Sequence, residues 1–171
     1  MPVPPINTAH AARRTIRFIS SAQALADAAT LAAADSAGTL SQTGNWSLGQ
    51  ALNHVAAWMT FALDGYPVAA PPELAARARA ARTRAFGQGL MAGFSIPGVP
   101  GGTAASAPCA TACALAALQS AWARFERETP CHPHPFFGDL TPDEWLALQL
   151  RHSELHQSFF FPGASPTSPH A

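Results

Sequence analysis

The fold is decided by the stretch at residues 47–65, which reads SLGQALNHVAAWMTFALDG. Ser47 followed three residues later by Gln50 is a capping box, in which both side chains satisfy free backbone N–H groups at a helix start. Apolar residues then recur at helical spacing until an Asp-Gly pair marks the end. The stretch therefore predicts an amphipathic helix over residues 48–63. Its apolar stripe is formed by Leu48, Leu52, Val55, Met59 and Ala62.

Three further main helices are predicted by the same signals. Thr141 and Glu144 form a second capping box with Pro142 at the first helical position. The segment at 87–108 is rich in glycine, proline and small residues, which is typical of a long crossover or lid. The expected fold is all-α, an antiparallel four-helix bundle with a long crossover between main helices two and three. The remaining main helices are expected at 21–35, 109–128 and 142–160, with an extra Ala- and Arg-rich helical piece at 72–86 whose arginines form a solvated face.

One domain is expected, because 171 residues lie within the size range of a single core. We assign residues 1–12 to a loose N-terminal segment, 13–161 to the bundle domain and 162–171 to a flexible tail. Within the domain, residues 15–19 alternate between polar and apolar side chains and predict a short extended arm.

Composition excludes several partners. Ten basic and ten acidic residues cancel, so no overall field attracts nucleic acid or an anionic membrane. No window approaches the roughly 20 apolar residues needed to cross a bilayer. Three cysteines form no even disulfide framework, and no signal peptide is evident, so the expected location is the cytoplasm. Charged residues make up only 12 % of the chain, which favours self-association as a homodimer.

Three histidines are candidate metal ligands. His152 and His156 lie four residues apart on the apolar stripe of the last helix, and His54 occupies an equivalent face of the second. Histidines facing a core are costly unless their ring nitrogens are satisfied. One divalent metal, about 2.0–2.1 Å from each ring, would satisfy all three. The alternative is three core histidines with separate hydrogen bonds to backbone or water.

Other polar residues are weaker candidates. Glu154 lies about 200° around the helix from each neighbouring histidine, so it cannot act as the base of a His-Glu-x-x-His site. His134 lies in a Pro-rich aromatic loop, where it either positions the loop or faces the substrate. His134 and Gln50 are the residues expected on the substrate side, and the residues that carry out catalysis stay unassigned.

Two segments resemble a known group of proteins. Residues 45–54, NWSLGQALNH, look like the helix-two signature of the DinB-like superfamily of metal-binding four-helix bundles. Residues 134–145, HPFFGDLTPDEW, followed by His152 and His156, resemble an uncharacterised bacterial branch of that superfamily, a domain of unknown function. The resemblance covers residues 13–161. It implies a divalent metal, zinc or nickel, bound by His54, His152 and His156.

The resemblance also implies a class of chemistry. Characterised relatives include S-transferases that use low-molecular-weight thiols, and isomerases. A metal held by three neutral imidazoles keeps its full charge and an open position, which activates a thiol or a water. The absence of an obvious general base favours thiol transfer to a small-molecule electrophile. A metal-dependent hydrolase and a non-catalytic metal- or ligand-binding bundle are the alternatives.

Overall fold

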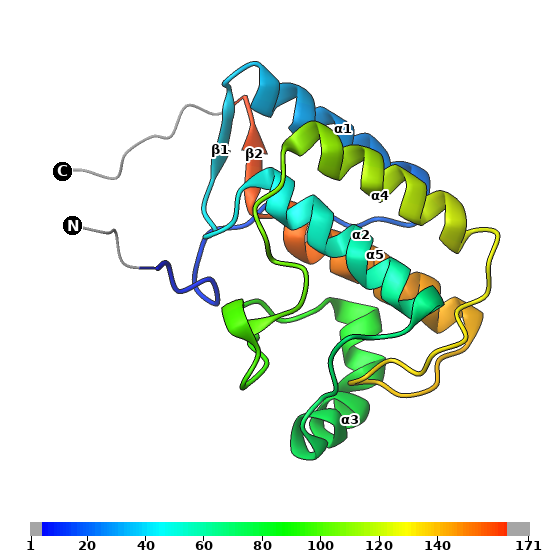
Figure 1. Cartoon of the computed structure of the whole chain (residues 1–171). Coiled ribbons are helices and arrows are strands. Elements are labelled where there is room, and N and C mark those ends of the chain that lie inside the picture. The colour runs from blue at the N-terminus through cyan, green and yellow to red at the C-terminus, as the bar shows by residue number, and fades with distance from the viewer. Residues whose placement is uncertain (1–4, 164–171) are drawn as a thin grey trace.

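The computed structural model describes residues 5–163, which are mostly helical. They form five helices and a small two-stranded sheet, which lies at one end of the molecule beside the first helix (Figure 1). None of the helices formed by these residues is long and apolar enough to cross a membrane. The elements are α1 (Ser21–Ser36), β1 (Leu40–Gln42), α2 (Leu48–Asp64), α3 (Pro72–Gln88), a 3₁₀ turn at Pro100–Gly102, α4 (Thr111–Phe125), α5 (Pro142–Gln157) and β2 (Phe160–Pro162).

The predicted capping boxes form at the starts of α2 and α5. The Ser47 hydroxyl accepts a hydrogen bond from the Gln50 backbone N–H, while the Gln50 carboxamide accepts one from the Ser47 N–H. Thr141 and Glu144 make the same reciprocal pair. Each box satisfies two N–H groups that a helix start would otherwise leave free.

Contacts between helix ends give the helix directions. Gly49, at the start of α2, lies against the Cys109 carbonyl just before α4, and the far ends of the same two helices meet at Asp64 and Arg124. Thus α2 and α4 run in parallel, side by side (Figure 1). An antiparallel arrangement was expected throughout. The pairs α1 with α4 and α2 with α5 do run antiparallel. The helices α2 and α4 do not, because the long crossover returns the chain to the end of the molecule at which α2 begins.

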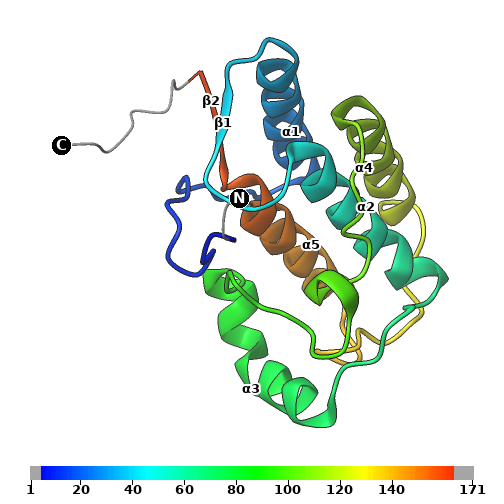
Figure 2. The same cartoon turned by 60° about the vertical axis from the view of Figure 1, so that its left-hand side comes forward.

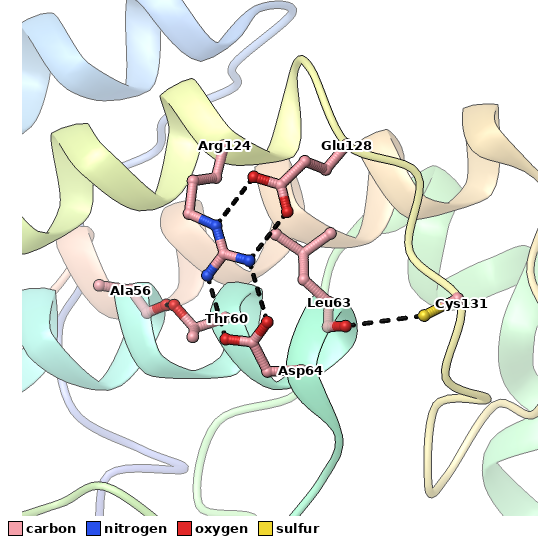
Figure 3. A network of polar contacts seen from close by, with 7 residues as sticks. All are labelled: Ala56, Thr60, Leu63, Asp64, Arg124, Glu128 and Cys131. Atoms are coloured by element: carbon pink, nitrogen blue, oxygen red, sulfur yellow. Dashed lines mark hydrogen bonds and ion pairs between the residues drawn. The ribbon is translucent and has the colours of Figure 1, made fainter.

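Arg124 joins the ends of α2 and α4 (Figure 3). Its guanidinium donates to both carboxylate oxygens of Asp64, at 2.9 and 3.0 Å, and to those of Glu128, at 2.8 and 2.9 Å. These hydrogen bonds lower the pKa of both carboxyl groups. The Cys131 thiol lies beside this network and donates to the Leu63 carbonyl.

The helix ends differ from the prediction in two places. The helix expected at 142–160 ends at Gln157, and after a turn at residues 158–159 the chain forms β2, which pairs antiparallel with β1. The helix expected at 109–128 spans only Thr111–Phe125. The expected arm at 15–19 lies in no strand, and of the expected flexible tail, residues 164–171 lie outside the described part of the chain. A sheet with three residues per strand is too short for its alternation to be recognised in a sequence.

The crossover is anchored rather than loose. It consists of α3, which stands beside the other helices and contacts α5, and the segment that follows it (Figure 2). Ile96 in that segment is 2 % exposed and packs in a cluster with Trp58 and Phe136. The expected lid at 87–108 is therefore fixed to the rest of the protein at Ile96, while Met91 and Phe94 before it are exposed.

The parallel contact of α2 and α4 predicts the effect of Gly49→Ala. A Cβ there would overlap with the Cys109 carbonyl oxygen and lie 3.1 Å from the Thr111 nitrogen, which are both backbone atoms. We expect urea denaturation to show a loss of about 1–3 kcal/mol in the free energy of unfolding, as for overpacked cores.

Gly87→Ala is the matched control. A Cβ at Gly87, which also lies in a helix, meets nothing within 4 Å. This change should leave stability equal or raise it by up to about 1 kcal/mol, because glycine is a poor helix former. Equal stability of the two variants would contradict the close α2–α4 contact.

Candidate metal centre

Three imidazoles converge between α2 and α5. The Nε2 atoms of His152 and His54 are 3.2 Å apart. Each of the three histidines, His54, His152 and His156, has a ring nitrogen within 4.8 Å of those of the other two. Bonds of about 2.0–2.1 Å to one ion require nitrogen separations of roughly 3–4 Å, a range that the Nε2 atoms of His54 and His152 meet, and the three residues together could hold a metal ion.

The helices explain the convergence. Residues four apart in α5 lie on one face, which brings His152 and His156 together. Because α5 runs antiparallel to α2, that face meets His54, and the three ring centroids are 4.7–5.0 Å apart. Trp46 stacks on His156 at 5.3 Å with the rings nearly parallel, and its edge contacts His54. These packed rings hold the imidazoles in their orientations.

A backbone carbonyl orients His54. Its Nδ1 is 2.9 Å from the carbonyl oxygen of Ala104, which lies in the crossover segment. A carbonyl only accepts, so Nδ1 carries the proton and Nε2 turns its lone pair toward the other histidines. Metal-binding histidines are commonly held in this way by a hydrogen bond to the other ring nitrogen.

Burial keeps the three rings neutral. It lowers the pKa of His54 to about 4, partly offset by the hydrogen bond to Ala104. The pKa values of His152 and His156 are also well below the usual value, because of burial and of repulsion from neighbouring imidazolium groups. Neutral rings each present one lone pair to a metal at pH 7.

Hydrogen bonds to the described residues do not satisfy all the ring nitrogens of the three histidines. His152 and His54 can share one proton between their Nε2 atoms. The ring of His156 makes no hydrogen bond with any of residues 5–163. His54 thus has a backbone partner, whereas no described residue supplies one to His156, and the three converging ring nitrogens could hold a divalent metal.

The histidines lie at the wall of a cavity of about 1250 Å³. Its lining is mostly apolar and aromatic, and none of the described residues that line it is acidic. Two polar groups in it are buried without a partner, the Tyr66 hydroxyl and the Gln149 Oε1. Such groups, on a concave apolar surface, are typical of a ligand site.

Residues 10–163 match the family model described as a protein of unknown function (DUF1569). The chain belongs to the DUF1569 family. No curated protein and no solved structure matches it.

In the DUF1569 chain His134 lines the same cavity. Its Nδ1 accepts hydrogen bonds from the backbone N–H groups of Phe136 and Phe137, each at 3.2 Å. Burial lowers its pKa to about 3, so the ring is neutral and its single proton is on Nε2. His134 thus holds the loop and also offers a fixed donor.

Gln50 is not brought to the cavity. Its carboxamide oxygen serves the capping box, and its Nε2 donates to the Ser106 carbonyl at 3.0 Å. Glu154 is also remote, because its Oε1 accepts from the backbone N–H of Phe18 at 2.6 Å and pairs with Arg151 at 2.8 Å. Neither side chain is free to serve as a base in the site.

Sequence reasoning missed Tyr66, Gln149 and the Ala104 carbonyl. Gln149 carried a signal, since it is a polar residue on the stripe of α5 that also holds Trp145 and His152, and it is only 2 % exposed. Tyr66 and Ala104 lie outside the helices, where spacing predicts no orientation.

The cluster predicts metal binding that depends on all three histidines. His54→Ala, His152→Ala and His156→Ala should each remove most of the zinc or nickel retained after dialysis, measured by elemental analysis. The fall in affinity should exceed the roughly 10–100-fold loss seen when only a partner that orients a ligand is removed.

His132→Ala is the control, because His132 is exposed and outside the cavity lining. It should keep wild-type metal content. Metal retained at wild-type level without His54 would contradict the three-histidine site, provided that circular dichroism shows the same helix content.

Proposed function

We propose that this DUF1569 protein is a metal-dependent transferase that activates a low-molecular-weight thiol and joins it to a small electrophilic substrate. One observation carries the proposal. Three neutral imidazole nitrogens converge at the wall of a large apolar cavity that has no carboxylate among its described lining residues.

We further propose that α1, α2, α4 and α5 form a DinB-like four-helix bundle. The positions of the histidines support this, with one on α2 and a His-x3-His pair on the last helix. The pairing of α2 with α4 across a long crossover is a second supporting feature.

The metal in this proposal is zinc or nickel, held by His54, His152 and His156. When bound, such an ion lowers the pKa of a thiol or water in its open position, which provides a nucleophile near pH 7. The protein supplies three neutral ligands, which leave the full double positive charge in place. The Ala104 carbonyl keeps His54 in the required tautomer.

Thiol transfer suits the site better than hydrolysis. The sulfur forms a bond to the electrophilic carbon, the bond from that carbon to its leaving group breaks, and the thiol proton passes to solvent. A thiolate needs no base once it has lost its proton, whereas attack by water is aided by a positioned base. His134 cannot be that base, because its Nδ1 is occupied by two backbone N–H groups.

His134 has a different role in the proposal. Its Nε2–H faces the substrate and donates to an oxygen of the electrophile or of its leaving group. The Trp58 ring lies between the two parts of the site, with its centroid 5.8 Å from that of His134 and 6.2 Å from that of His152. The donor is therefore one aromatic ring away from the metal ligands.

The test is turnover with a thiol. Metal-loaded protein incubated with a small thiol and 1-chloro-2,4-dinitrobenzene should consume both at equal rates and release chloride. His152→Ala should reduce the rate by at least about 100-fold, as expected when an activating group is lost. Turnover of ester substrates without thiol would instead favour the hydrolase, and metal binding without any turnover would favour a non-catalytic protein.

Two substitutions at His134 separate its roles. His134→Asn keeps an acceptor for the two loop N–H groups but removes the distal donor. His134→Gln provides a donor near the Nε2 position but removes that acceptor. We expect His134→Asn to keep wild-type stability and metal content while it loses turnover. Full turnover in His134→Asn would assign His134 to the loop alone.

A further inference from the structure

The helix α3 turns two arginines toward the cavity. Arg77 and Arg84 are seven residues apart, two helical turns, and so lie on one face. Both line the cavity, and α3 packs against α5, the helix that carries His152 and His156. Both side chains are exposed, as the predicted solvated face requires. Arg79, between these two, is also exposed but does not line the cavity.

No described acidic side chain forms an ion pair with Arg77 or Arg84. Arg82, on another face of α3, pairs with Glu144 at 3.2 Å and donates to the Asp139 carbonyl. Arg77 and Arg84 form no ion pair or hydrogen bond within residues 5–163. The described cavity lining contains no acidic side chain, and a metal bound by neutral histidines would add two more positive charges. A cavity with this charge favours an anionic ligand.

The same cavity has an exposed apolar edge. Met91 and Phe94, in the segment that follows α3, are 70 % and 53 % exposed and also line the cavity. They are among the few large apolar side chains that the described chain leaves open to solvent. Exposed apolar surface at a concave site is typical of ligand binding.

We propose that Arg77 and Arg84 bind the carboxylate of an amphiphilic substrate whose apolar body packs against Met91 and Phe94. A guanidinium presents a planar pair of donors that matches the two oxygens of a carboxylate. The inference rests on the proposed function in one respect: the carboxylate belongs to the electrophile that the thiol attacks. Recognition of the carboxylate by the arginines does not itself require the metal.

The experiment compares octanoate with octan-1-ol by isothermal titration calorimetry. The two probes share the apolar chain and differ in charge. Octanoate should bind more tightly than octan-1-ol to metal-loaded protein and to protein freed of metal by a chelator. The double substitution Arg77→Gln/Arg84→Gln should weaken octanoate binding by about tenfold or more in both forms, the effect expected on losing charged hydrogen bonds. Arg79→Gln, the matched control on α3, should bind octanoate as the wild type does.

The outcomes distinguish this inference from the proposed function. Equal affinity for the two probes, no octanoate binding, or an equal loss in Arg79→Gln would overturn the carboxylate site even if thiol turnover is observed. Octanoate binding that needs Arg77 and Arg84 in protein that neither holds metal nor uses thiol would support the carboxylate site and overturn the proposed function.

Discussion

The position of the histidine cluster and its cavity depends on the close contact of α2 with the start of α4. Gly49 allows the α2 backbone to approach the Cys109 carbonyl, so the two helices lie side by side in parallel. A parallel pair requires a crossover along its whole length. That crossover supplies the Ala104 carbonyl that orients His54, and it contributes α3 and the outer wall of the cavity. The site is therefore a product of the helix topology.

Much of the fold and the histidine cluster could be predicted from the sequence, because the signals are local. Capping boxes mark helix starts, and the spacing of His152 and His156 places them on one face. Helix direction could not be predicted, since it depends on Gly49 meeting a backbone carbonyl distant in the chain. The Ala104 carbonyl has no sequence signal. Gln50 was expected near the substrate, but its carboxamide is used by the helix start and by the Ser106 carbonyl.

The cost of burying imidazoles connects stability with function. Neutral imidazole rings that make few hydrogen bonds lose their hydration when the protein folds, which costs free energy. When the protein unfolds at a pH below the usual histidine pKa, the same rings take up protons, which favours the unfolded state. Stability of the metal-free protein should therefore fall as the pH drops below about 6.5. A ligand that binds only the folded state offsets this cost by mass action. The histidine cluster is thus destabilising by itself, and a divalent ion satisfies it.

X-ray absorption spectroscopy at the zinc edge of zinc-loaded protein tests whether one ion is bound by all three histidines. The three-histidine site predicts three imidazole nitrogens at about 2.0–2.1 Å from the zinc. A shell with fewer than three imidazoles in the wild type would contradict that site. So would a sulfur ligand from a cysteine at about 2.3 Å.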